Sequence, residues 1–290
     1  MKNSILFLIL ILILSCQSNT KKKDNENEWI PIWNGNDFTG WHSYLGTPYN
    51  LEIDSKGNTI EPFGIDNDPL EVIKVVETNQ GKAIRISGVA WGMIYTEGEF
   101  SNYHLKLKVK WGEDMHRPRE NGPRDSGLLY HGFGEPGSAY FWMNSQELQI
   151  QQGDMGDYWP VGNVGIDIPS IPYDDKYYMF KADADLRAYY SAEILETNAQ
   201  DSLAKRRVFK AFDTEKSHGQ WNDVELIVLG DSSIHIVNEK VVMRLFNSRT
   251  MSNKHLLNSG KIIIQSEGAE VYYKDIYIKK IQEIPEEFKQ

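Results

Sequence analysis

The sequence predicts an all-β protein built as an antiparallel sandwich or barrel, and three observations lead to that class. Segments in which apolar and polar residues alternate recur from Ala83 onward, helix signals are weak, and turn-forming Gly, Pro, Asn and Asp residues separate the segments. A repeat with a period of roughly 20–50 residues is not evident, which argues against propellers and solenoids. We therefore expect one domain over residues 29–290, long enough to bury a substantial core.

The clearest strand runs from Leu105 to Trp111, where apolar residues alternate with three lysines. The other expected strands are, in chain order, residues 83–87, 93–97, 127–131, 147–151, 177–182, 223–229, 233–237, 261–266 and 271–279. Residues 65–69 and 166–175 contain Pro and Asp and are expected to be loops, as is most of 34–69. A short helix is expected at 199–204.

The N-terminus resembles the export signal of a bacterial lipoprotein. Lys2 is followed by an uninterrupted apolar run at residues 5–14, which is shorter than the roughly 20 residues that span a bilayer. The run ends at Ser15 and Cys16, as in a lipobox. We predict a signal peptide at 1–15, lipidation of Cys16, a disordered tether at 16–28, and a membrane-anchored protein that faces the periplasm or the cell exterior.

Composition excludes several other functions. The net charge of −10 and the isoelectric point near 5.3 argue against nucleic-acid binding. Cys16 is the only cysteine, so an intrachain disulfide and a cysteine-built zinc site are both excluded. Aromatic residues make up 12% of the chain, and such rings can stack on sugar faces. Trp33 and Trp41, near the N-terminus, are expected in the core.

One predicted strand carries polar residues on a whole face. Glu147, Gln149 and Gln151 alternate with Leu148 and Ile150, and a loop rich in Gly, Asp and aromatic residues follows. A strand face with one carboxylate and two amides beside such a loop suits the floor of a sugar-sized cleft. The alternative is a strand whose polar face simply meets water.

Six segments in register resemble the family of 3-keto-disaccharide hydrolase domains. They are WNGNDFTGW (33–41), NYHLKLKVKWGE (102–113), RDSGLLYH (124–131), ELQIQQGDMGDYW (147–159), GQWNDVELIVLG (219–230) and GKIIIQSEGAEVYYKDIYIK (260–279). The resemblance implies a jelly-roll sandwich similar to concanavalin A. It also implies action on glycosides whose C3 hydroxyl has been oxidised to a ketone. Asp125, His131 and Lys274 depart from the residues common in the family, which indicates a subgroup.

The implied chemistry needs a base, a positive or hydrogen-bonding group on the ketone oxygen, and an acid for the leaving group. A 3-keto group acidifies the C2 proton, so removing that proton lets the C1 substituent leave by elimination, whereas an ordinary glycosidase uses two facing carboxylates. His131 is predicted to be the base, because neutral imidazole accepts protons near pH 7. Glu147 is the alternative base, or a metal ligand, or the partner of an arginine. Arg124 is predicted to polarise the ketone.

Further residues are predicted to bind the sugar. Gln149, Gln265 and Glu267 lie in predicted strands and suit sugar hydroxyls, although they could instead form polar cross-strand pairs. Tyr158 and Trp159 are predicted to form a stacking wall.

The residues also leave open whether the protein binds a divalent metal ion. Asp154 and Asp157 are spaced to bind a hard cation, and Glu147 with His131 could hold one as a Lewis acid. Paired aspartates also simply favour tight turns.

Two function classes follow from this reading. The first is a hydrolase or lyase that cleaves 3-keto-glycosides by C2 proton abstraction and elimination, with or without later hydration. The second is a non-catalytic carbohydrate-binding lipoprotein, since the same fold serves both. The catalytic prediction requires His131, Glu147 and Arg124 to converge on one cleft.

Overall fold

The computed structural model describes residues 28–191 and 206–289. The predicted signal peptide, Cys16 and nearly all of the predicted tether lie outside the described residues, as does the short helix expected at 199–204. Within the described ranges the chain forms strands and two short 3₁₀ helices, η1 (Pro48–Asn50) and η3 (Glu286–Phe288). No helix of this part is long and apolar enough to cross a membrane.

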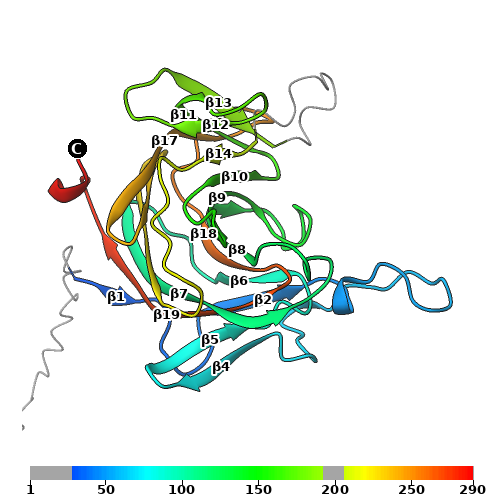
Figure 1. Cartoon of the computed structure of the whole chain (residues 1–290). Helices are drawn as coiled ribbons and strands as arrows, with labels where there is room; N and C mark the ends of the chain where they lie inside the picture. The colour runs from blue at the N-terminus through cyan, green and yellow to red at the C-terminus, as the bar shows by residue number, and fades with distance from the viewer. Residues whose placement is uncertain (1–27, 192–205, 290) are drawn as a thin grey trace, which may run out of the picture.

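The strands form two packed sheets, and the predicted all-β jelly-roll sandwich is confirmed (Figure 1). Sheet A runs in the spatial order β4 (Ile73–Thr78), β5 (Gly81–Ile86), β19 (Ala269–Lys280), β7 (Tyr103–Met115), β15 (Asn222–Leu229), β16 (Ser232–Val237) and β17 (Lys240–Thr250), with β1 (Ile30–Pro31) beside β19.

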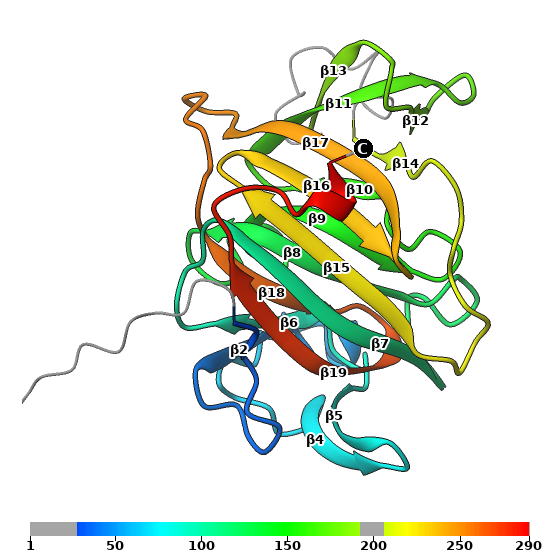
Figure 2. The ribbon, with the colours of Figure 1, turned by 90° about the vertical axis from the view of Figure 1, so that its left-hand side faces the viewer.

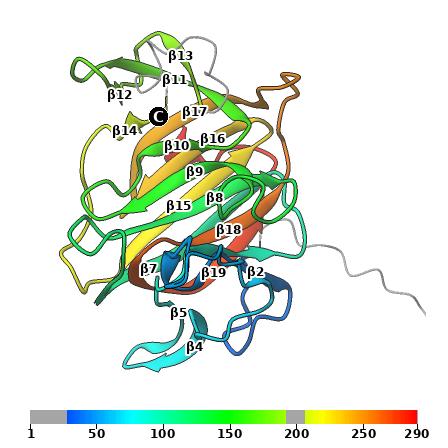
Figure 3. The same ribbon diagram turned by 90° about the vertical axis from the view of Figure 1, so that its right-hand side faces the viewer.

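Sheet B runs in the order β3 (Gly64–Ile65), β2 (Trp41–Leu45), β6 (Gly92–Thr96), β18 (Lys261–Ser266), β8 (Asp125–Phe133), β9 (Asn144–Gln151), β10 (Tyr158–Val161), β14 (Val208–Phe209), β12 (Tyr178–Phe180) and β11 (Val164–Pro172). Strand β11 also pairs with β13 (Leu186–Tyr190) and β17, which joins the two sheets along one edge. Figure 2 looks onto sheet A, and Figure 3 shows the opposite side, where β8, β9 and β18 face the viewer.

Alternation of side chains builds the core between the sheets. Leu105, Leu107, Val109 and Trp111 of β7 point inward from sheet A and meet residues such as Leu148 of β9 in one buried cluster. Each large apolar side chain buried in this way contributes about 1.5–3 kcal/mol of transfer free energy. Because successive residues of a strand face opposite ways, the polar residues between them point out of the sandwich.

The ten strands expected from alternation are all present, with ends that differ by a few residues. Trp33 and Trp41 are buried as expected. The expectation of a loop at 166–175 is wrong, because β11 extends through Pro169 to Pro172. The partners of β11 change along its length: β17 pairs as far as Asp167, β13 as far as Pro169, and β12 from Ser170 to Pro172, so each proline stands where a pairing ends and its missing N–H is tolerated.

Candidate active site

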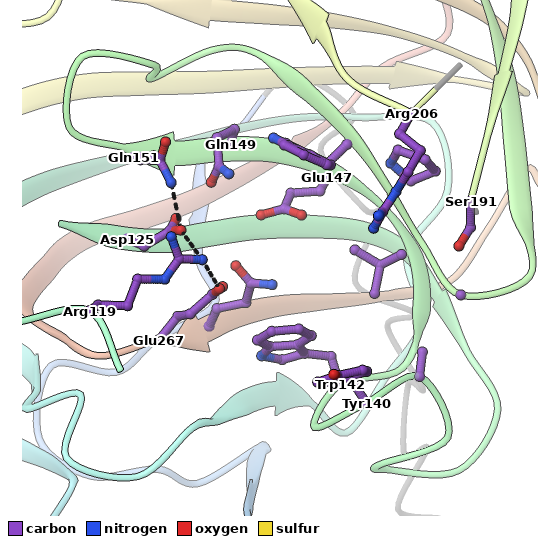
Figure 4. A pocket seen from close by; sticks show the side chains of 16 residues that line it. Arg119, Asp125, Tyr140, Trp142, Glu147, Gln149, Gln151, Ser191, Arg206 and Glu267 are labelled. Atoms are coloured by element: carbon purple, nitrogen blue, oxygen red, sulfur yellow. Dashed lines mark hydrogen bonds and ion pairs between the residues drawn. The ribbon is translucent and has the colours of Figure 1, made fainter. Parts of the chain in front are cut away.

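A cavity of about 370 Å³ lies on the outer face of sheet B, the face directed away from sheet A. Its floor comes from β8, β9 and β18, and its walls come from β10 and from the segments after β7, β8, β10, β13 and β18 (Figure 4). The polar residues that line it are Arg119, Asp125, Glu147, Gln149, Gln151, Ser191, Arg206, Gln265 and Glu267, and the aromatic ones are Tyr140, Trp142 and Trp159. The volume suits a sugar ring and part of its substituent.

Strand register brings the floor residues together. In the β8–β9 pair, Asp125 lies opposite Gln151, Gly127 opposite Gln149, and Leu129 opposite Glu147. These positions all lie on the outer face, since their neighbours Leu148 and Ile150 are in the core. The polar face predicted for this strand therefore forms the cavity floor rather than an ordinary solvated surface.

Gly127 creates the space in which two of these groups meet. A Cβ atom at this position would collide with Glu147 Oε1 and Gln265 Oε1, so both oxygens occupy the place of the missing side chain. The backbone of β8 is thereby open to a carboxyl from β9 on one side and an amide from β18 on the other. A larger residue at position 127 would push both out of the cavity floor.

Arg119 anchors two of the three carboxyls in the cavity. Its Nη2 atom lies 2.6 Å from Asp125 Oδ2 and also pairs with Glu267 Oε1. Gln151 Nε2 donates a second hydrogen bond to Asp125 Oδ2 at 2.6 Å, while Asp125 Oδ1 is buried without a partner. Figure 4 shows this network at one end of the cavity.

Glu147 is the third carboxyl, and it has no hydrogen bond or ion pair with any described residue. Burial, followed by repulsion from Glu267 and Asp125, raises its pKa well above the ordinary range. Burial and the neighbouring Glu267 also raise the pKa of Asp125 well above its usual value. The pKa of Glu267 is raised by burial, and the Arg119 guanidinium opposes that shift.

Aromatic side chains wall the cavity. Trp142 donates Nε1–H to Gly92 O at 2.9 Å, which fixes its ring, and the exposed Tyr140 stacks on it with centroids 6.4 Å apart. Trp159 also lines the cavity, and Arg206 Cζ lies 5.4 Å from its ring centroid. Figure 4 shows Trp142 and Tyr140 across the cavity from Arg206. The apolar faces of a sugar ring fit between such surfaces.

The structure does not bring the three predicted catalytic residues together. Glu147 is in the cavity, but His131 is buried on the other side of sheet B, where its Nδ1 lies 2.9 Å from Ser248 Oγ. Alternation from Gly127 and Leu129 would place His131 on the cavity face. The register shifts after Tyr130, and His131 has a φ of 52°, so this irregularity turns its side chain inward. Burial lowers the pKa of His131 to about 4.

Arg124 and Tyr158 also lie outside the cavity. Arg124 donates to Gly112 O at 3.0 Å and to Gln152 Oε1 at 3.0 Å, so it braces the loop beside β9. Tyr158 is completely buried and donates to Gln146 Oε1 at 2.7 Å. The other predicted sugar-binding residues, Gln149, Trp159, Gln265 and Glu267, do line the cavity.

The pair predicted as one metal site has a different partner. Arg207 Nη2 lies 2.7 Å from Asp154 Oδ2 and 2.6 Å from Asp157 Oδ2, so a guanidinium takes up the charge of both carboxylates. The second predicted pair, Glu147 and His131, lies on opposite faces of sheet B. Among the described residues, no group of three or more His, Cys, Asp or Glu side chains is placed to hold a metal ion.

Several cavity residues were not predicted to be functional. Asp125 could have been found from alternation, because it shares a face with Gly127 on the strand that pairs with β9. Arg119, Tyr140, Trp142 and Arg206 lie in connecting segments, where no periodic pattern marks the direction of a side chain.

Crystal structures similar to this chain include two from Parabacteroides distasonis, each described as a "putative glycosyl hydrolase". The first is 17% identical, with 90% of this chain and 97% of that chain covered and a TM-score of 0.49. The second is 15% identical, with 88% and 100% covered and a TM-score of 0.46. The carbohydrate-binding module CBM66 from Bacillus subtilis is 9% identical, with 71% and 91% covered and a TM-score of 0.39.

The match that bears on function is to a family. Residues 28–279 match the model of a family described as the 3-keto-alpha-glucoside-1,2-lyase-like domain. The match covers most of the chain and includes every described residue that lines the cavity. No curated protein matches the chain.

Proposed function

This chain belongs to the 3-keto-alpha-glucoside-1,2-lyase-like family, and we propose that it cleaves glycosides whose C3 hydroxyl has first been oxidised to a ketone. The observation that carries the proposal is the cavity itself. Three buried carboxyls converge there on a space of about 370 Å³ between aromatic walls, and one of them, Glu147, has no partner among the described residues.

The reaction proceeds by elimination. A base takes the proton from C2, and the electron pair of that bond forms an enolate with the C3 ketone. The enolate collapses, a double bond forms between C1 and C2, and the C1–oxygen bond breaks as an acid protonates the departing oxygen. Water added across the double bond would turn the elimination into a net hydrolysis, and both outcomes stay within the proposal.

We assign the base to Glu147 rather than to His131. The Glu147 carboxyl lies over Gly127 in the cavity floor, and its raised pKa makes its ionised form a stronger base than an exposed carboxylate. His131 lies away from the cavity, hydrogen-bonded to Ser248. A positioned base typically contributes about 10²–10⁴-fold to the rate.

Asp125 is the proposed acid. Its pKa is raised by burial and by Glu267, which favours a protonated carboxyl at neutral pH. Arg119 and Gln151 hold Oδ2, and Oδ1 is left without a partner. A carboxyl held by one oxygen and free at the other suits proton delivery to a leaving group.

The test is aglycone release from an aryl 3-keto-glucoside compared with its unoxidised parent, with and without EDTA. We expect release from the keto form alone, and a loss of about 10²-fold or more in Glu147→Gln. Glu113→Gln is the matched control, because Glu113 is an exposed glutamate whose partner is His218. Loss of activity on EDTA treatment would favour the predicted metal.

Mass analysis of the sugar product separates lyase from hydrolase, because the unsaturated product is lighter by one water. Release from neither substrate, together with measurable sugar binding, would instead favour the carbohydrate-binding function.

We also propose that the protein is an exported lipoprotein anchored through Cys16, on the strength of the apolar run and lipobox-like sequence before it. The expected result is that the full chain partitions with membranes and incorporates labelled palmitate. A Cys16→Ser variant that retains the label would contradict the proposal.

A further inference from the structure

The two arginines that line the cavity differ in their partners. Arg119 is paired with Asp125 and Glu267. Arg206, from the segment just before β14, has no ion pair with any carboxylate of the described residues. Its neighbour Arg207 shows the contrast, since Arg207 holds both Asp154 and Asp157.

Arg206 is also short of hydrogen-bond partners. Its Nε atom is buried and has none, and the same is true of Nε1 of Trp159, on whose ring the guanidinium lies. Figure 4 shows the Arg206 side chain directed into the cavity. Both unpartnered atoms are donors. The guanidinium of Arg206 has only donors, so the part of the cavity wall that it lines suits a ligand oxygen that only accepts hydrogen bonds.

The floor of the cavity has the opposite polarity. Its lining residues include Gln149 and Gln265, whose side-chain oxygens have no hydrogen-bond partner among the described residues. Sugar hydroxyls can donate to such oxygens, whereas a ketone oxygen cannot. The cavity therefore distinguishes the two kinds of substrate oxygen, with hydroxyls directed to the floor and the ketone directed to the wall of Arg206 and Trp159.

Charge points the same way. Arg119 pairs with Asp125 and Glu267, whereas no carboxylate of the described residues pairs with Arg206. The guanidinium of Arg206 is therefore available to the negative charge that develops on an enolate oxygen.

We propose that Arg206 binds the C3 ketone oxygen of the substrate and stabilises the enolate formed when the C2 proton is removed. Trp159 fixes the plane of the guanidinium by stacking. Arg206 thus takes the role that the sequence suggested for Arg124. The assignment rests on the proposed function, since it requires a substrate with a ketone.

The test isolates enolate formation from cleavage. The probe is a 3-keto-1,5-anhydroglucitol, which has hydrogen in place of the C1 substituent and so cannot eliminate. Exchange of its C2 proton for deuterium in D₂O is followed by proton NMR, and cleavage of an aryl 3-keto-glucoside is measured in parallel. The variants are Arg206→Gln, Arg206→Lys and, for chemical rescue, Arg206→Ala. The matched control is Arg187→Gln, because Arg187 also lies over an aromatic ring, at 5.0 Å from Tyr178, but outside the cavity.

We expect Arg206→Gln to lose about 10²–10³-fold in both exchange and kcat, with KM little changed, as for the loss of one oxyanion donor. Arg206→Lys keeps the charge, so its exchange rate and kcat should lie between those of Arg206→Gln and the wild type. If Arg206→Gln does not fold, Arg206→Lys is compared with the wild type instead. Added methylguanidinium should partly restore exchange to Arg206→Ala, which a purely structural role would not allow.

Two results would overturn the assignment by different routes. If the wild type exchanges the C2 proton and Arg206→Gln exchanges it equally fast, Arg206 does not stabilise the enolate. A variant in which only KM rises would lead to the same conclusion. Either result would leave the proposed function in place. A wild-type protein that neither exchanges the C2 proton nor releases aglycone would overturn the proposed function and this assignment with it.

Discussion

A carboxyl that is buried without its own cation behaves differently from one on a protein surface. Glu147 is in that position, because Arg119 is paired with Asp125 and Glu267, and burial together with repulsion from these two carboxyls outweighs the more distant attraction of Arg119. Removing water from around a carboxylate disfavours the charged form and raises the pKa. The group therefore becomes a stronger base once ionised, at the cost of being ionised in a smaller fraction of molecules.

This shift predicts the pH dependence of the reaction. If Glu147 is the base, only its ionised form is active, so kcat/KM should rise with pH through a pKa above the ordinary range of glutamate. The measurement is the pH profile of kcat/KM on an aryl 3-keto-glucoside. Glu147→Gln should lose this rise along with most of its activity. The profile should fall again at higher pH as Asp125, the proposed acid, loses its proton, and a wild-type profile without a rising limb would contradict the assignment of Glu147 as the base.

At this scale the sequence predicted part of the site. Alternation on one strand identified Glu147 and Gln149, and it worked because a strand fixes the direction of each side chain. Arg119 and Arg206 were not identified, because loop conformation sets their directions and the relevant contacts are distant in sequence. His131 was predicted to be the base, which required it to share a cleft with Glu147, and it does not, because the register shift after Tyr130 turns it inward.

Strand β8 performs two tasks that depend on its local backbone. Up to Leu129 it keeps the regular register that aligns Asp125 and Gly127 with β9. After Tyr130 the register shifts, and His131 adopts a positive φ and turns away from the cavity. The first half of the strand therefore belongs to the active site, and the second half to the interior of the sandwich.

A substitution at His131 should affect stability and not chemistry. Asn tolerates a positive φ, so His131→Asn keeps the backbone but loses ring packing and alters the hydrogen bond to Ser248. We expect a loss of about 1–3 kcal/mol in the free energy of unfolding, with kcat/KM and its pH profile unchanged in the folded protein. Denaturant unfolding and steady-state kinetics measure the two effects. A folded His131→Asn with abolished activity would restore His131 as the candidate base.

A substitution at Gly127 should have the opposite effect, lowering activity with little change in stability. In Gly127→Ala the new methyl group collides with Glu147 Oε1 and Gln265 Oε1, and these ends of flexible side chains can move aside at small cost in stability. Since displacement of a catalytic group by about 1 Å can cost on the order of 10²-fold in rate, we expect kcat to fall strongly while the melting temperature changes little. Gly98→Ala is the control, because no atom lies within 4 Å of its added Cβ. Equal kcat in the two variants would contradict the placement of Glu147.

At the scale of elements, periodicity predicted the regular strands well. It missed strands whose sequence does not alternate between apolar and polar residues. Residues 105–111 alternate cleanly and form the centre of β7. Strand β11 was expected to be a loop because of its prolines. Each proline lies where the pairing with β13 or β12 ends, and that tertiary property is not contained in a local pattern.

Of the three smaller hydrophobic clusters beside the main core, one lies on the side of the molecule that supplies part of the cavity wall. Tyr158, Phe180, Tyr189 and Leu245 belong to this cluster, which packs between β10, β11, β12, β13 and β17. Glu147 and Asp125 come from the main sandwich, whereas Trp159, Ser191 and Arg206 come from the side of this smaller cluster. The geometry of the cavity thus depends on how firmly the two parts are joined.

Arg207 forms one of the ion pairs that join these two parts of the molecule. It connects the start of β14 to Asp157, whose side chain is completely buried in the turn before β10. Arg207→Gln would leave that carboxylate without its guanidinium. We expect a loss of about 3–5 kcal/mol in the free energy of unfolding, measured by denaturant titration. Arg187→Gln, an arginine with no carboxylate partner among the described residues, should lose far less; equal losses would show that Arg207 does not join the two parts.

The eight residues of β9 are under two different evolutionary constraints, one from the core and one from the cavity. Leu148 and Ile150 pack in the core, so selection removes most substitutions at these positions because the protein no longer folds. Glu147, Gln149 and Gln151 line the cavity and make no contact in the core between the sheets, so changes there leave that core intact. Under the proposed function, new glycosides could therefore be accommodated one outward residue at a time, without a new scaffold for each.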